Sequence, residues 1–276
     1  MPGKTIVVTS GKGGVGKTTT TANLGVGLAL RGHKVVVIDT DIGLRNLDVV
    51  MGLENRIVYD LVNVVEGTCK VNQAMIRDKH CENLYLIPAA QIRDKTAIQA
   101  GQLREVCEQL KNDFDYVVID CPAGIELGFQ NAITAADEAV VVTTPEVSAI
   151  RDADRVIGLV EAAQLPTPGL VVNRFKPQMV KQNDMMNTQQ IMELLSVQLL
   201  GVVPDDEQVI VATNLGLPVV HSQKSQSGEA FRRIAARVDG EVMPFLDLTA
   251  NPGFLSRLKR VFSGNGKANG RGSFNG

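Results

Sequence analysis

Residues 11–18, Gly-Lys-Gly-Gly-Val-Gly-Lys-Thr, constrain the fold of this chain more than any other stretch. They match the pattern G-x-x-x-x-G-K-[ST], in which a glycine-rich turn directs backbone N–H groups toward an anion. Residues 5–9 before it form a β-branched run typical of a buried strand, and residues 18–30 after it have the apolar spacing of a helix. Because the motif requires a strand, a turn and a helix in this order, we predict a loop that holds the phosphates of a nucleotide.

The residue types in this loop indicate what each can do. A helix N-terminus carries a partial positive charge that favours bound phosphate. Lys17 can reach the β- and γ-phosphates, and the Thr18 hydroxyl can ligate Mg²⁺. A chance glycine-rich turn is the alternative, which the agreement of motif and context disfavours. The residues expected at the nucleotide are Gly11, Lys12, Gly13, Gly14, Val15, Gly16, Lys17, Thr18 and Thr19.

Lys12 is a second lysine in the loop, which a phosphate loop does not need to hold its own nucleotide. Taken alone, it is typical of a solvated surface lysine. The run Lys-Gly-Gly-Val-Gly-Lys-Thr-Thr at residues 12–19, however, resembles the deviant Walker A signature of the ParA/MinD ATPases. The resemblance implies Mg²⁺-dependent hydrolysis of ATP, with Lys12 and Lys17 in catalytic roles. It implies further that Lys12 reaches across an ATP-sandwich homodimer to the partner's nucleotide.

Two further apolar runs, residues 34–39 and 115–120, are predicted strands that end in acids. Acids at the carboxyl end of a parallel strand point into the crevice where ligands bind. Asp120 has the form of a Walker B aspartate that can hold a Mg²⁺-bound water, and Gly124 can place an N–H near the γ-phosphate. The resemblance makes residues 39–48 switch I, in which Asp41 orients the attacking water and senses Mg²⁺. A solvated loop acid is the alternative for Asp41, and a strand-terminal acid opening a turn is the alternative for Asp120.

Within the family, residues 43–48, Gly-Leu-Arg-Asn-Leu-Asp, are most similar to the MinD branch, and Asn46 is a second switch candidate. The predicted helix at residues 148–163 matches a helix that lies near the dimer and regulator surface in that branch. Asp152 and Asp154 on it are therefore candidate partner contacts. Alternating charges are also typical of a solvated helix face, so this alternative stays open.

The resemblance assigns the recognition of the base to two strand ends. Asn173 follows the predicted strand 169–173, and in the family an asparagine here recognises adenine, since an amide can both donate and accept along the base edge. Pro204 and Asp205 follow the strand 199–203 and are expected to cover the base with backbone atoms. A turn-forming asparagine is the alternative for Asn173.

Strands and helices alternate along the whole chain. Besides the segments above, we predict strands at 84–88 and 138–144, a short edge strand at 218–220, helices at 98–110, 188–195 and 228–246, helical fragments at 55–83 and a loop at 176–187. Such alternation predicts an α/β fold, a doubly wound and mostly parallel sheet of about seven to eight strands flanked by helices. This is the SIMIBI-like P-loop NTPase class.

Composition limits the compartment and the chemistry. Aromatic residues make up only 4% of the chain and hydrophobic residues 44%, so the core must be aliphatic. None of the four cysteines forms a C-x-x-C pair, which disfavours a zinc or redox site. No secretory segment and no apolar run of ~20 residues is visible, so we expect a cytoplasmic chain with reduced thiols.

The basic charge is concentrated at the C-terminus. The net charge is −2, and residues 251–276 carry five basic residues and no acid, which leaves −7 for the rest. Residues 254–262 place apolar side chains on one face of a helix and basic ones on the remainder, as in an interfacial amphipathic helix. The residues expected at the membrane are Phe254, Leu255, Arg257, Leu258, Lys259, Arg260, Val261 and Phe262. A terminal helix docked on the domain is the alternative.

These features predict three segments: an ATPase domain at 1–250, a membrane-targeting helix at 251–263 and a disordered Gly/Asn-rich tail at 264–276. The resemblance implies an ATP-dependent dimer, peripheral on the inner face of the cell membrane, that helps select the division site. The resemblance implies a MinC-like inhibitor of division-ring assembly and a MinE-like activator as partners. A body at −7 disfavours nucleic acid, and with it the alternative of a ParA-like partition ATPase. An electron-transfer iron protein would need a bridging cysteine pair, which we cannot match here.

Overall fold

In the computed structural model, residues 2–94 and 96–248 are described. The chain divides into two units, residues 1–246 and residues 247–276. The predicted membrane helix and the predicted Gly/Asn-rich tail lie outside the described residues, so the predicted domain limits stay predictions.

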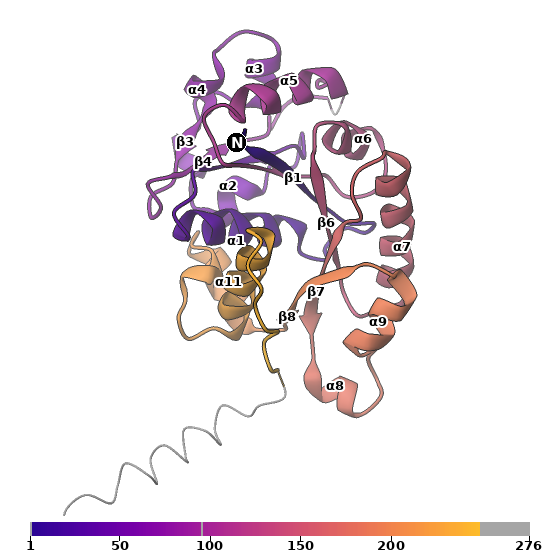
Figure 1. Ribbon diagram of the computed structural model, residues 1–276. Helices are drawn as coiled ribbons and strands as arrows, with labels where there is room; N and C mark the ends of the chain where they lie inside the picture. Colours follow the sequence, from indigo (N-terminus) through magenta and orange to yellow (C-terminus); the bar gives the residue numbers. More distant parts are fainter. Residues whose placement is uncertain (1, 95, 249–276) are drawn as a thin grey trace, which may run out of the picture. The chain divides into compact units, whose positions relative to one another are not determined.

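An eight-stranded sheet forms the centre of the first unit (Figure 1). The strand order is β3-β4-β2-β5-β1-β6-β7-β8, and the pairings are parallel except for β3 with β4. This confirms the doubly wound, mostly parallel sheet. The strands are β1 (Lys4–Thr9), β2 (Val35–Asp39), β3 (Ile76–Arg77), β4 (Leu84–Ile87), β5 (Tyr116–Asp120), β6 (Glu138–Thr143), β7 (Gly169–Phe175) and β8 (Gln198–Pro204).

Helices cover both faces of the sheet. Figure 1 shows α1 and α11 packed together on one side, with α5, α6 and α7 on the other. The α-helices are α1 (Lys17–Leu30), α2 (Leu47–Val50), α3 (Leu61–Val65), α4 (Val71–Ala74), α5 (Ala100–Leu110), α6 (Leu127–Thr134), α7 (Val147–Ala162), α8 (Pro177–Lys181), α9 (Thr188–Leu195), α10 (Glu207–Asn214) and α11 (Gln226–Val238). Two 3-10 helices are η1 (Glu54–Arg56) and η2 (Val219–His221).

The core between α1, α11 and the sheet is aliphatic, as the composition predicts. Ile6 and Val8 of β1 face it, while Val7 points to the other side, which is the alternation expected of a strand buried on both faces. Phe231 of α11 is fully buried in this core. A Cβ on Gly27 of α1 would lie 2.7 Å from Ala235, so glycine lets the two helices approach closely.

Two of the predicted boundaries at the C-terminal end are wrong. The predicted edge strand at 218–220 is the 3-10 helix η2, because its Val220 N–H donates to the Asn23 side chain of α1 (2.8 Å) and not to a sheet edge. The closing helix ends at Val238 and not at 246. Gly240, with φ +87°, follows the helix and has the left-handed conformation that ends helices.

The helix α6 was not predicted, and neither were two shorter elements. β3 is a two-residue antiparallel edge strand within a region expected to be helical fragments and turns. α8 is a five-residue helix inside the predicted loop 176–187, with Pro177 in its first turn. Neither is long enough to show a hydrophobic period.

Candidate nucleotide site

The glycine-rich loop joins β1 to α1 at the carboxyl edge of the sheet. Gly14 and Gly16 have φ of +78° and +99°, which an L side chain rarely adopts. Gly16 is the N-cap of α1, no side chain caps this end, and the first turn holds no acid. The first N–H groups of α1 are therefore available to an anion, and a Cβ on Gly14 would meet nothing within 4 Å.

Lys17 is buried at the start of α1 beside the Asp120 carboxyl. Asp120, at the end of β5, accepts a hydrogen bond from Thr21 Oγ1 (3.0 Å). Burial, and then the neighbouring Asp39, raise the pKa of Asp120, while Thr18 and Lys17 oppose that rise. The structure thus brings the predicted phosphate lysine, the Mg²⁺ hydroxyl and the Walker B aspartate together.

Asp39 is a site residue that the sequence did not single out. It is the register partner of Asp120 across β2 and β5, and it is fully buried. Its carboxyl accepts backbone N–H groups of Asp41 (2.9 Å), Asn46 (3.2 Å) and Leu47 (3.1 Å). Burial raises the pKa of Asp39, and these hydrogen bonds oppose the rise. Asp39 therefore holds the backbone of switch I, defined as residues 39–48.

Asp41, in predicted switch I, lies beside the loop that follows β5. It lines a small cavity of about 40 Å³, together with Pro122, Ala123 and Glu126 from the loop after β5. Thr40 ties the two loops by donating its hydroxyl to the Asp120 carbonyl (2.7 Å). The second loop, residues 120–128, contains Gly124 at φ +91°.

A second buried acid, which the sequence did not single out, binds Arg45 within predicted switch I. Asp48 is fully buried, and Arg45 Nε lies 2.8 Å from its Oδ2. Asn46 precedes α2 at the N-cap position, where its side chain is exposed and makes no capping bond. The exposed Asn46 amide is thus available to a ligand or partner.

A cavity of about 1030 Å³ continues from the phosphate loop to the ends of β7 and β8. Gly16 and Thr19 line one part of it, and Asn173, Pro204 and Asp205 line another. The predicted phosphate and base residues therefore share one cavity.

Asn173 has a role that the sequence did not indicate. Its Nδ2 donates to the carbonyl of Val15 (2.8 Å), so the side chain is bonded to the phosphate loop itself. A Cβ on Gly16 would lie only 2.2 Å from this nitrogen. Asp205, at the far part of the cavity, is ion-paired with Lys176 (3.1 Å).

The remaining predicted residues lie on the surface around the loop. Lys12 and Asp154 are exposed, and Asp152 is half-buried. Gly11 packs directly on α7, because a Cβ there would lie 2.3 Å from the Asp152 carbonyl oxygen. The predicted partner helix and the phosphate loop are therefore in contact. Cys121 is buried, which raises the pKa of its thiol to about 12 and makes it a poor nucleophile.

Residues 2–239 match the family model described as ParA, an NUBPL iron-transfer P-loop NTPase. The chain is 54% identical over 263 residues to the septum site-determining protein MinD of Bacillus subtilis, covering 94% of this chain and 98% of that protein. The chain belongs to the ParA/MinD family. As a member of the MinD branch it is a septum site-determining ATPase, and it uses ATP and Mg²⁺.

Two solved MinD structures share the fold. The MinC:MinD complex of Aquifex aeolicus has a TM-score of 0.82 and 45% identity, and the match covers 87% of this chain and 98% of that one. MinD of Pyrococcus horikoshii complexed with Mg-ADP has a TM-score of 0.78 and 33% identity, with 86% and 96% covered.

The groups present fit a nucleotide with Mg²⁺. The loop offers uncapped N–H groups for phosphate, and Lys17 supplies a fixed positive charge. The Thr18 hydroxyl with the Asp39 and Asp120 carboxyls gives the oxygen donors that Mg²⁺ prefers. When bound, the cation neutralises charge on the phosphates. These residues would bind and orient the nucleotide, and the water-positioning role expected of Asp41 stays a prediction.

Asp41→Ala is expected to bind ATP with near-normal affinity but to release phosphate at least about a hundredfold more slowly, because positioned proton acceptors contribute about 10²–10⁴ to a rate. Nucleotide titration and phosphate release on the same protein measure the two effects. Glu126→Ala is the matched control, since Glu126 is an exposed acid that lines the same cavity. Normal turnover in Asp41→Ala would rule out the assigned role.

Proposed function

We propose that this ATPase dimerises with ATP, binds the inner face of the cell membrane peripherally and recruits a division-ring inhibitor there. The observation that carries the proposal is a cavity lined by the predicted nucleotide residues, in a chain whose residues 254–262 have the sequence pattern of a basic amphipathic segment. The described residues contain no helix long and apolar enough to span a membrane. A DNA-binding partition function remains the second reading, against which the −7 charge of residues 1–250 counts.

Lys12 supports the dimer. Its backbone is held by the Ser10 hydroxyl, which donates to the Lys12 carbonyl (2.8 Å), while its side chain is exposed. Within residues 2–94 and 96–248, no carboxylate lies within ion-pair distance of its ammonium group. An exposed lysine of the phosphate loop that has no ion-pair partner among the described residues is available to the nucleotide of a second copy.

Lys12→Ala should bind ATP nearly as well as the unsubstituted protein but should not dimerise or hydrolyse it. The reason is that Lys17 supplies the charge within the chain, whereas Lys12 would act on the partner's nucleotide. Size-exclusion chromatography with ATP and a phosphate-release assay measure the outcome. A normal ATP-dependent dimer with normal turnover would make Lys12 an ordinary surface lysine.

The magnitudes suit a reversible membrane switch. A helix shorter than ~12 residues is largely unfolded in water, so binding must offset the cost of ordering it. Three basic residues contribute ~3 kcal/mol at an anionic surface, and partly inserted apolar side chains add a few more. One tail therefore binds weakly, while two tails on a dimer gain about 10²–10⁴ in avidity. ATP would load the protein onto the membrane, and hydrolysis would release it.

We also assign a MinC-like inhibitor and a MinE-like activator as partners. The Aquifex structure is a MinC:MinD complex, which supports the first of these for a chain 45% identical to it. The candidate contact surface is α7, where Asp154 is exposed and Asp152 contacts the start of the phosphate loop. Such a contact would let a partner sense, or alter, the nucleotide state.

Phe262→Glu tests the membrane assignment. It removes an aromatic side chain from the apolar face, adds a charge at the acyl boundary and adds repulsion from anionic lipid, so ATP-dependent pelleting with anionic vesicles should be lost. ATP binding and melting temperature should stay near those of the unsubstituted protein. Phe274→Glu is the matched control, because it makes the same change outside the amphipathic segment. A destabilised Phe262→Glu protein that still pellets would mean that the segment belongs to the fold.

A further inference from the structure

A fixed segment after α11 exposes apolar side chains to solvent. Val242 is 98% exposed and Phe245 is 52% exposed, with Pro244 exposed between them. We name Val242 and Phe245 the apolar foot.

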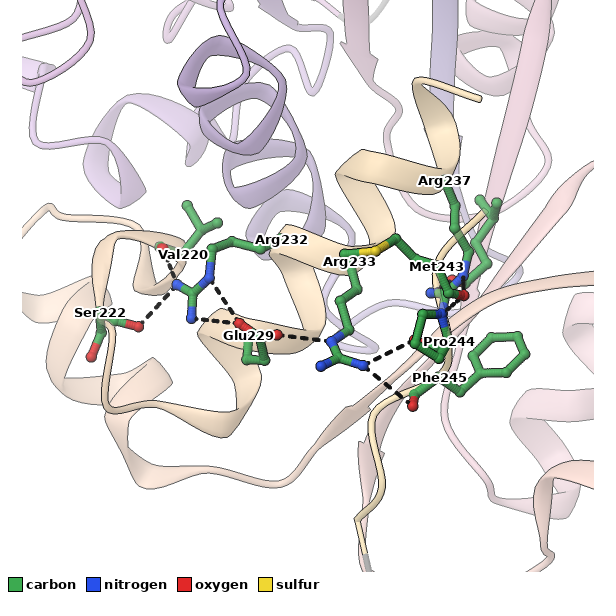
Figure 2. A network of polar contacts seen from close by, with 10 residues as sticks. Val220, Ser222, Glu229, Arg232, Arg233, Arg237, Met243, Pro244 and Phe245 are labelled. Atoms are coloured by element: carbon green, nitrogen blue, oxygen red, sulfur yellow. Dashed lines mark hydrogen bonds and ion pairs between the residues drawn. The ribbon is translucent and has the colours of Figure 1, made fainter. Parts of the chain in front are cut away.

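The backbone of this segment is bound by two arginines of α11, as Figure 2 shows. Arg233 Nη1 donates to the carbonyls of Pro244 (3.0 Å) and Phe245 (3.4 Å). Arg237 donates to the Met243 carbonyl from Nε (3.1 Å) and Nη2 (2.9 Å). Its guanidinium also lies over the Phe245 ring, 4.1 Å from the centroid. Three successive carbonyls are therefore satisfied within the protein.

The beginning of the segment is bound to the residues that follow α1 and to the start of β5. Asp239 accepts hydrogen bonds from Arg31 Nε (2.9 Å) and from the Tyr116 hydroxyl (2.9 Å), and it pairs with His33 (2.8 Å). Glu241 pairs with Arg31 (2.8 Å). Since both ends are held, the exposure of the foot is imposed by the fold.

We propose that the apolar foot is a second lipid contact, which inserts at the surface of the membrane that the predicted helix 254–262 binds. This inference rests on the proposed membrane function. Only eight residues, 246–253, separate Phe245 from Phe254, a reach of about 30 Å, so a bound helix keeps the foot close to the bilayer. A carbonyl entering the interface is costly unless it is hydrogen-bonded, and here the arginines supply those bonds.

The size of the foot favours a membrane over a protein partner. A stable protein interface buries at least ~1,200 Å² in total, which two side chains do not approach. A few apolar side chains are sufficient for shallow insertion beside an amphipathic anchor. A tail helix alone would connect the ATPase domain to the membrane only through a linker. A second contact on the domain itself would also restrict the orientation of the domain at the surface.

A single tryptophan can report this contact, because the chain contains none. We expect the emission of Val242→Trp to shift to the blue when ATP and anionic phosphatidylglycerol vesicles are added, and to be quenched by brominated lipid. Val58→Trp is the matched control, since Val58 is also an exposed valine (79%), and its emission should not respond. Val242→Ser should weaken vesicle binding about fivefold without changing the melting temperature.

The outcomes separate the two proposals. Pelleting of Val242→Trp with vesicles but no quenching would overturn the foot and leave the membrane function intact. A blue shift that grows with protein concentration in the absence of lipid would mean that a second copy covers the foot, which also overturns it. Failure of the unsubstituted protein to pellet would refute the proposed function itself. Quenching of Val242→Trp that disappears when Phe262→Glu is introduced into the same chain supports both the foot and the proposed membrane function.

Discussion

Lys17→Ala is expected to lower the affinity for ATP at least about a hundredfold. Removing a charged partner of the phosphates costs up to about 3 kcal/mol, and each 1.4 kcal/mol is tenfold in affinity. The loss should be large here because Lys17 is buried beside the Asp120 carboxyl. Without its ammonium group, the phosphates would approach two buried acids, Asp39 and Asp120, with no fixed cation between them. Titration calorimetry with ATP and Mg²⁺ measures the change.

Lys12→Ala is the natural control for this result, since it removes the same charge from the exposed part of the same loop. It should retain most of the monomer's affinity. Unchanged ATP binding by a folded Lys17→Ala protein would contradict the assignment of the whole loop.

Gly16→Ala should both destabilise the protein by about 3 kcal/mol and abolish nucleotide binding. A non-glycine residue at φ +99° costs about 1–3 kcal/mol in strain, and its Cβ would lie 2.2 Å from Asn173 Nδ2. The side chain of Asn173 would have to leave the Val15 carbonyl, which would remove a bond that shapes the loop. Urea unfolding and nucleotide titration measure the two losses.

Gly14→Ala separates the strain from the clash. Gly14 also has a positive φ, +78°, but a Cβ there meets nothing within 4 Å. Gly14→Ala should therefore lower the free energy of unfolding only by the cost of the backbone strain. Combining Gly16→Ala with Asn173→Ala should recover part of the stability, because the second change removes the clashing nitrogen. If Gly16→Ala were no worse than Gly14→Ala, the contact with Asn173 would not matter to the loop.

Much of the fold follows from local pattern. The seven longer predicted strands are all present, because continuous apolar runs bounded by polar residues are read without tertiary information. The strand-terminal acids also indicated the edge of the sheet that holds the site. Parallel strands align their carboxyl ends, so the acids that close the strands 34–39 and 115–120 were expected in the ligand crevice, although no role of its own was predicted for Asp39.

The remainder depended on tertiary contacts. Val219 and Val220 are β-branched and suit a strand. Both are buried, however, and the Val220 N–H donates to the Asn23 side chain of α1. Asp39 and Asp41 look equivalent in sequence. Only the register of β2 with β5 buries Asp39 against Asp120 and leaves Asp41 at the switch cavity. The bond from Asn173 to the loop joins residues far apart in the chain, for which the sequence holds no signal.

The central position of β1 also determines when the sheet can form during synthesis. β1 is the first strand synthesised, but its neighbours are β5 and β6, and Val7 pairs with Ile119 and Ala139. At about 5–20 residues per second of synthesis, roughly ten seconds separate the emergence of β1 from that of its partners. During that time an apolar strand has no edge to join, and such non-local pairings also slow folding. The apolar β1 of this nascent chain therefore stays without its sheet partners until the middle third of the chain emerges.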